Sequence, residues 1–142
     1  MEIKIFDCLP GEAAAIRKEV FMDEQGFVSE FDATDDAAHH LVLFDGDRAV
    51  ATCRVYACEG GFAVGRIAVV REYRGRHCGA SLLHGAEELI KKLGGHKIII
   101  HAQTRVQAFY EKLGYSLFGT ADEDEGGARS AALFLLDRSG AV

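Results

Sequence analysis

The spacing of apolar and polar residues along the chain predicts an alternation of short strands and helices. Residues 2–7 alternate polar and apolar side chains, which is typical of a half-buried strand. Pro10 and Gly11 interrupt that alternation. Residues 11–22 then repeat apolar residues at the spacing of one helix face, at Ala13, Ile16, Val20 and Phe21.

The middle of the chain is predicted to form an antiparallel meander. Asp45-Gly46 is a strong signal for a two-residue hairpin, and Gly60-Gly61 supplies a second turn. The apolar runs around these turns indicate three strands, at residues 38–44, 48–58 and 62–70.

A long amphipathic helix followed by a buried strand is predicted next. The helix covers residues 76–93, and Gly94-Gly95 ends it. Residues 97–101 form a continuous apolar run, which is typical of a strand buried on both faces. A strand, a crossover helix and a second strand imply a right-handed parallel unit. The predicted apolar stripe of the helix is Cys78, Leu82, Leu83, Ala86, Leu89, Ile90 and Leu93.

Two segments of the chain are less regular. Residues 23–36 are acidic and without clear periodicity, and a segment this long inside a compact domain is usually functional or mobile. Residues 122–127 read as a polar loop. No repeat, linker or low-complexity tract divides the chain, so we expect one domain over residues 1–142. A short helix and two strands complete the predicted elements, at residues 104–113, 115–118 and 131–137.

Composition and charge narrow the classes of function. The formal net charge of −6 argues against a general nucleic-acid or membrane-surface binder, because such proteins carry basic fields. The N-terminal residues lack a signal-peptide core and no apolar run is long enough to span a bilayer, so the expected location is the cytoplasm. Neither the histidines nor the cysteines show a recognised metal spacing, so we predict no metal. The cysteines are expected to be reduced thiols, at Cys8, Cys53, Cys58 and Cys78.

The junction between the third meander strand and the long helix carries the candidate chemistry. The first N–H groups of a helix are unsatisfied donors, and the helix dipole adds positive potential there. Glycine lets the backbone approach a ligand closely, and arginine can bond two phosphate oxygens at once. The junction is therefore predicted to bind an anion, and a pyrophosphate fits it best. Its three arginines and two glycines are Arg71, Arg74, Gly75, Arg76 and Gly79.

Two motifs in this order of elements resemble the GNAT N-acetyltransferase family. The family's acetyl-CoA turn is Gln or Arg, two residues, Gly, one residue, then Gly or Ala; here residues 74–79 match it, with His77 in place of the first glycine. Residues 109–115 are similar to the family's second motif, and Gln103 stands where the family often has Asn. The front half of the chain, around residues 19–26, resembles the ElaA/YjcF-like branch.

The resemblance implies the GNAT fold, an α/β (α+β) class with a mostly antiparallel mixed sheet, a central parallel strand pair and flanking helices. It also implies acetyl-CoA as cosubstrate. The backbone of Ile67, Ala68 and Val69 would bind the pantetheine arm and polarise the thioester carbonyl. The same strand could equally be plain core, and the arginines of the turn could be merely solvated. The remaining cofactor contacts that the resemblance implies are Arg74, Gly75, Arg76, His77, Cys78, Gly79, Ala80, Gln103, Phe109 and Tyr110.

The resemblance also implies that Tyr110 is the catalytic acid. A phenol with a pKa of about 10 can donate a proton to the leaving thiolate at neutral pH. Tyr110 equally fits a core stripe with Phe109. The general base is open, because many relatives carry a Glu on the strand before the turn, where this chain has Val64, Gly65 and Arg66. Candidates for contact with the acceptor are Glu24, Gln25 and His40, of which Glu24 and His40 are also candidates for a base.

The leading hypothesis is an acetyl-CoA-dependent N-acetyltransferase that acts on a primary amine by direct attack in a ternary complex. The acceptor would be a small-molecule or peptide amine, with no nucleic acid or membrane as partner, and homodimers are common among such folds. The acidic residues of 23–36 and 122–125 would either attract a cationic amine or be merely solvated. A non-catalytic acyl-CoA-binding or sensor module and a structural domain with no cofactor remain as alternatives.

Overall fold

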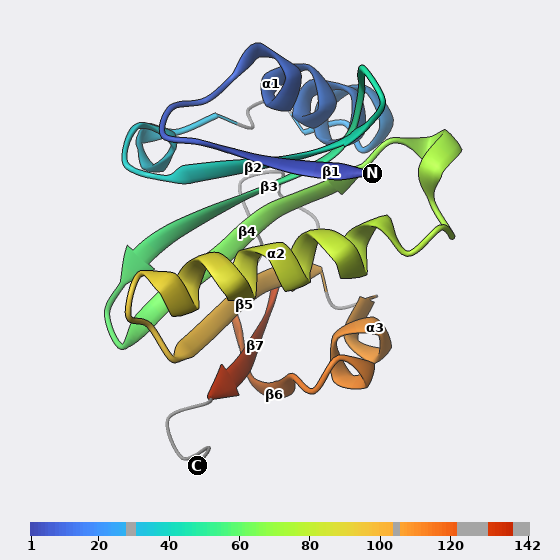
Figure 1. The fold of residues 1–142 in the computed structure, drawn as a ribbon. Helices are drawn as coiled ribbons and strands as arrows, with labels where there is room; N and C mark the ends of the chain where they lie inside the picture. The colour runs from blue at the N-terminus through green and yellow to red at the C-terminus, as the bar shows by residue number, and fades with distance from the viewer. Residues whose placement is uncertain (28–30, 104–105, 122–130, 138–142) are drawn as a thin grey trace.

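A single mixed sheet of seven strands forms the centre of the computed structural model, which describes residues 1–27, 31–103, 106–121 and 131–137. Its strand order is β1-β2-β3-β4-β5-β7-β6. Among the described residues every neighbouring pair is antiparallel except β4 and β5, which are parallel (Figure 1). The strands are β1 (Glu2–Phe6), β2 (His39–Asp45), β3 (Arg48–Cys58), β4 (Gly61–Val69), β5 (Lys97–Gln103), β6 (Ser116–Ala121) and β7 (Ala131–Asp137). The predicted fold class is confirmed.

The helices lie close to the positions predicted from the sequence, but not all of them are α-helices. The helix predicted at residues 11–22 is an α-helix followed directly by a π-helical segment that carries the helical path to Glu24. The helix predicted at residues 104–113 is shorter. The described helices are α1 (Gly11–Arg17), the π-helix η1 (Lys18–Glu24), the 3-10 helices η2 (Ala33–Asp36) and η3 (Arg71–Tyr73), α2 (Cys78–Lys92) and α3 (Gln107–Lys112).

The two faces of the sheet are covered by different helices (Figure 1). On β2, Val42 and Phe44 pack with Ala13 of α1, whereas Leu41 lies beside Gly85 of α2. Successive side chains of a strand point to opposite faces, so β2 is buried on both sides. All of residues 40–44 are buried, which explains why this strand reads as a continuous apolar run rather than an alternation.

The hairpin and the helix end are placed by glycines in the left-handed region. Asp45 pairs with Arg48, so the tight turn is Gly46-Asp47, one residue later than predicted, with Gly46 at φ +60°. At the end of α2, Gly94 has φ +87° and donates its N–H to the carbonyl of Lys91. Leu93, predicted on the apolar stripe, is 43% exposed because it follows the last helical residue.

The parallel pair β4–β5 creates the feature that positions the site. The two strands are in register only at residues 62–64 of β4 and 98–100 of β5. Beyond that point β4 continues to Val69 and β5 to Gln103 without further pairing to each other among the described residues. A bulge on β4 places Arg66, at φ +51°, and Ile67 together between the pairs Arg54–Gly65 and Thr52–Ala68. The strands therefore diverge next to the turn that enters α2.

Candidate active site

The turn between β4 and α2 has the backbone conformation of a glycine-rich loop, although one of its residues is a histidine. Gly75 has φ +81° and His77 has φ +62°, and both values lie in the left-handed region that favours glycine. His77 occupies the N-cap position of α2 and makes no side-chain capping hydrogen bond. The geometry expected of the family's glycine is thus retained in this chain by a residue with a side chain.

The N-terminus of α2 presents donors to this turn. The N–H groups of Cys78, Gly79 and Ala80 precede Ser81, whose N–H donates to the carbonyl of His77 at 3.0 Å. The first N–H groups of a helix have no partner within it, and a helix of 15 residues adds its dipole at the same end. The exposed guanidinium of Arg76 contributes a full positive charge to the turn. The arrangement is suited to binding an anion.

Arg74 is held at two points. Its Nε donates to the carbonyl of Val69 at 2.9 Å, and its Nη2 donates to Oε1 of Glu24 at 2.9 Å. Arg71 approaches Oε2 of Glu24 at 3.4 Å. The hydrogen bond from Arg74 lowers the pKa of Glu24, and the charges of both arginines add to the effect. A carboxylate held in this way is a poor proton acceptor, and it lies at the turn between β4 and α2.

The second motif packs against the first turn of α2. The Cζ atom of Phe109, on α3, lies 3.5 Å from the position that a Cβ would take at Gly79. The rings of Phe109 and Tyr110 meet edge to face with centroids 5.0 Å apart. Tyr110 is only 4% exposed, and burial raises the pKa of its phenol, which therefore stays protonated at neutral pH. Gln103 lies at the end of β5 opposite Ala131, and its side chain is outside the described residues.

The β4 residues serve the core with their side chains. Beyond Val64 their backbone has no pairing to β5 among the described residues, although the carbonyl of Val69 already accepts from Arg74. Ala68 is buried, while Ile67 and Val69 pack against the core from partly exposed positions. A Cβ at Gly65, the residue before the bulge, would meet no atom within 4 Å. The face of β4 at Gly65 therefore has room for a small side chain. Beyond Val64 the edge of β4 toward β5 has no strand pairing among the described residues, which fits a strand that accepts an extended ligand.

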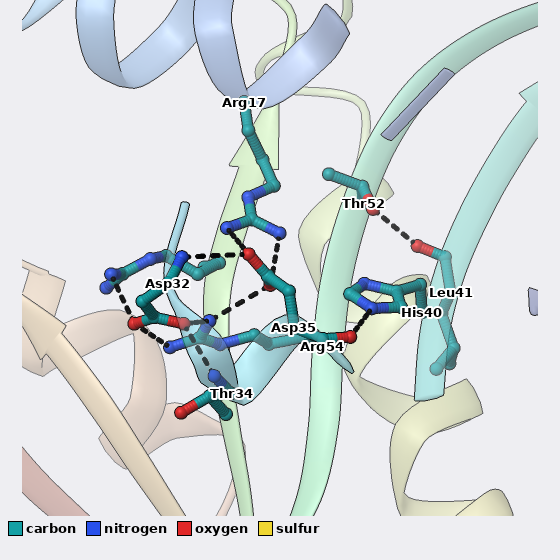
Figure 2. A network of polar contacts seen from close by, with 9 residues as sticks. Arg17, Asp32, Thr34, Asp35, His40, Leu41, Thr52 and Arg54 are labelled. Carbon is teal, nitrogen blue, oxygen red and sulfur yellow. Dashed lines mark hydrogen bonds and ion pairs between the residues drawn. The ribbon is translucent and has the colours of Figure 1, made fainter. Parts of the chain in front are cut away.

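A buried ionic network lies on the α1 side of the sheet (Figure 2), and sequence reasoning missed it. Asp35, at the end of η2, accepts hydrogen bonds from Arg17 at 2.8 and 3.1 Å and from Arg54 at 3.0 Å. Burial alone would raise the pKa of Asp35, but the hydrogen bonds and charges of the two arginines lower it to about 2. Asp32 accepts from Arg54 at 2.6 and 3.2 Å and from Arg66 at 3.3 Å.

This network fixes the segment that was predicted to meet the acceptor. Asp32 caps η2 by accepting from the N–H of Thr34, and its own N–H donates to Asp35. His40 is 1% exposed, and its Nε2 donates to the carbonyl of Asp35 at 2.9 Å. His40 therefore supports η2 from inside the protein. The half-buried Gln25 follows η1 at its C-cap.

Four of the acidic residues in 23–36 are paired with cations. Asp23 binds Lys18, Glu24 binds Arg71 and Arg74, and both network aspartates bind arginines. The Asp23–Lys18 pair and Asp36 are exposed to solvent, whereas Glu24, Asp32 and Asp35 are held by arginines. Residues 122–125 lie outside the described part of the chain.

Comparison with known proteins identifies the fold and the family. The model of the acetyltransferase (GNAT) domain matches residues 10–128. The chain belongs to the GNAT acetyltransferase family. This GNAT chain is 30% identical over 106 residues to the uncharacterized N-acetyltransferase YjcF of Bacillus subtilis, covering 73% of this chain and 76% of YjcF. This match supports the predicted likeness to the branch that contains YjcF. The family and its named relatives are acetyltransferases, which supports an acyltransferase.

Solved structures share the whole fold of this GNAT acetyltransferase. A structure from Lactobacillus plantarum has a TM-score of 0.83 at 28% identity, covering 96% of this chain and 99% of the other. Escherichia coli ElaA has a TM-score of 0.80 at 20% identity, covering 96% and 100%. A Bacillus subtilis acetyltransferase solved in complex with CoA has a TM-score of 0.76 at 18% identity, covering 96% and 97%. Among the described residues no helix of this chain combines the length and apolar character needed to cross a bilayer.

Proposed function

We propose that this protein transfers the acetyl group of acetyl-CoA to a primary amine by direct attack in a ternary complex. The observation that carries the proposal is the glycine-like turn at the N-terminus of α2, beside the point where β4 and β5 diverge. The donors of this turn and the edge of β4 that is unpaired with β5 beyond Val64 fit a ligand with a pyrophosphate and an extended arm. Acetyl-CoA supplies the activated acyl group.

Each part of the site would have its own role in binding or in catalysis. The N–H groups of Cys78, Gly79 and Ala80 hold the pyrophosphate, and the backbone of β4 holds the arm and polarises the thioester carbonyl. The amine first loses a proton to water and becomes neutral. Its nitrogen then forms the new bond to the carbonyl carbon, the carbon–sulfur bond breaks, and the phenol of Tyr110 gives its proton to the departing thiolate. The nitrogen of the product releases its second proton to water, and water returns a proton to the Tyr110 phenolate.

A covalent relay through Cys53 or Cys58 has little support. Burial raises the pKa of Cys53 to about 12 and also raises the pKa of Cys58, so neither thiol is an activated nucleophile. Direct transfer needs no enzyme-bound acyl group. The acceptor would be a small-molecule or peptide amine. The chain would act as one cytoplasmic domain. Light scattering would show whether it forms a homodimer.

A non-catalytic acyl-CoA-binding module is the second candidate. It is favoured by the absence of a carboxylate at residues 64–66 and by the engagement of Glu24 with arginines. The deciding experiment incubates the protein with acetyl-CoA and a panel of amines: a polyamine, an amino sugar, an amino acid and a peptide. Acetylated product is detected by mass spectrometry, because the chain's own cysteines would react with a thiol reagent. Product with any amine supports the enzyme. CoA binding with no product from any amine supports the module, and no CoA binding contradicts both.

A further inference from the structure

Glu24 links the helical segment at the front of the chain to the cofactor turn. It is the last residue of η1, and its carboxylate lies between the guanidinium groups of Arg74 and Arg71. The Arg74 contact spans 50 residues of sequence. The pair is therefore formed by the tertiary structure. It joins the segment around residues 19–26 to the turn at residues 74–79, which are separate in sequence.

The carboxylate is presented from a fixed element. Val20 and Phe21 of η1 are 4% and 8% exposed, and the N–H of Phe27 closes the segment onto the carbonyl of Phe21 at 3.0 Å. The side chain of Glu24 is 18% exposed, whereas that of the neighbouring Asp23 is 58% exposed. The Glu24 carboxylate is thus partly covered, whereas that of Asp23 faces solvent.

Arg74 is left with donors to spare. A guanidinium has five N–H groups, of which Nε is bonded to Val69 and one on Nη2 is bonded to Glu24. In the described part of the chain these are the contacts that Arg74 makes, and they leave the Nη1 group for a ligand. The side chain is therefore oriented before any anion arrives.

We infer that Glu24 is a positioning residue for the pyrophosphate site: it holds Arg74 in the orientation in which that arginine binds the phosphate oxygens. The inference rests on the proposed binding of acetyl-CoA at this turn. It assigns to Glu24 a role toward the cofactor, in place of the acceptor contact expected from the sequence.

Two opposing effects of Glu24 decide the direction of the result. Its negative charge repels a phosphate, but across a water-exposed site at physiological salt this changes affinity by about twofold or less. Ordering a rotamer-rich side chain on binding costs about three- to tenfold in affinity, and a preformed Arg74 avoids that loss. Positioning is therefore the larger effect.

The test compares substitutions at Glu24 by calorimetric titration with CoA. Glu24→Ala is expected to raise the Kd for CoA about three- to tenfold and the KM for acetyl-CoA in parallel, with kcat changed less than twofold. Glu24→Gln is expected to bind CoA at least as tightly as the wild type, because its amide oxygen accepts the same bond from Arg74 without the charge. Glu24→Asp keeps the charge but shortens the reach, so it should resemble the alanine variant.

Controls separate position from charge and from folding. Asp23→Ala removes the same charge one residue away and should leave the Kd within twofold. In an Arg74→Ala background, the substitution of Glu24 by Ala should have no further effect on the Kd. The melting temperature of each variant shows that it is folded, and Glu24→Asp carries the test if the alanine variant is not.

Three results would overturn the inference. Tighter CoA binding by both Glu24→Ala and Glu24→Gln would show that Glu24 competes with the phosphate. An unchanged Kd in Glu24→Ala would show that it does not act on the site. A full effect of Glu24→Ala without Arg74 would place its action elsewhere. A wild-type protein that does not bind CoA contradicts the proposed function itself, and the inference falls with it.

Discussion

The backbone at His77 takes φ +62° and ψ +19° just before the first turn of α2. For a residue with a Cβ, the left-handed region costs about 1–2 kcal/mol relative to right-handed backbone. The side chain is exposed and provides no cap, so the fold gains little from it in return. The strain belongs to the conformation that the anion turn requires.

His77→Gly should therefore raise the free energy of unfolding by up to about 1 kcal/mol, since relief of strain outweighs the added freedom of the unfolded chain. His77→Val should lower it by about 1–2 kcal/mol, because a β-branched residue tolerates this region least. Urea denaturation measures both. Arg76→Gly, at a position without positive φ, should be destabilising, and a destabilised His77→Gly would contradict the strain.

A substitution at Tyr110 tests its proposed role as the proton donor. Tyr110→Phe should lower kcat severalfold or more and leave the Kd for CoA unchanged, because it removes the proton donor and keeps the buried ring. The matched control is Tyr115→Phe, which removes the hydroxyl that donates to Glu87 at 2.9 Å and should leave kcat near that of the wild type. Wild-type kcat in Tyr110→Phe would remove Tyr110 from the mechanism.

At the scale of elements, η2 is attached to the sheet by charge. Arg17 and Asp35 are almost completely buried, and Arg54 joins them from β3. Removing one member of such a cluster leaves a buried charge without its partner, which typically costs about 3–5 kcal/mol. The attachment of η2 therefore depends on Asp35 being ionised.

The pH dependence of stability follows from the lowered pKa of Asp35. Its ordinary pKa is 3.8 and its folded value is about 2, so its contribution is complete above about pH 5 and is lost as the pH falls through 3.8 toward 2. Urea denaturation at pH 7, 5, 4 and 3 should show the wild type losing stability over this window. Asp35→Asn should be less stable at pH 7 and should show a flatter profile. Parallel profiles for the two proteins would contradict the assignment.

The surroundings of β4 can be tested with two glycines of this strand. A Cβ at Gly61, where the strands are close, would lie 2.5 Å from the carbonyl oxygen of Lys97 at a φ of +156°. Gly61→Ala should therefore lower the free energy of unfolding by about 2–4 kcal/mol. Gly65→Ala enters open space and should cost less than about 1 kcal/mol. Equal losses in the two variants would contradict this difference in surroundings.

On the scale of the whole molecule, ligand binding should appear as stability. The chain has a net charge of −6, so an anionic ligand must be held by local donors and not by the global field. CoA at 100 times its Kd should add about 2.7 kcal/mol to the free energy of unfolding. Pantetheine, which lacks the pyrophosphate, should add much less at the same concentration. An unchanged melting temperature at saturating CoA would contradict the proposed cosubstrate.

The sequence by itself determined the elements and their order, together with the two motifs that identify the family. Strands such as residues 48–58 and 131–137 could be predicted because the spacing of apolar residues is a local property of the sequence. Glycines likewise mark turns through a local backbone preference, which is why the end of α2 could be placed. The hairpin turn was displaced by one residue because pairing of Asp45 with Arg48 depends on the register of two strands.

Only the tertiary structure decided which charges meet. Arg17 finds Asp35 across 18 residues and Arg74 finds Glu24 across 50, and no local pattern selects one arginine over another for these contacts. The same holds for the separation of β4 from β5, which depends on a bulge opposite Cys53. Short-range preferences fix helices and strands, whereas ion pairs and strand divergence depend on how those elements pack, and it is the packing that places Glu24 at the cofactor turn.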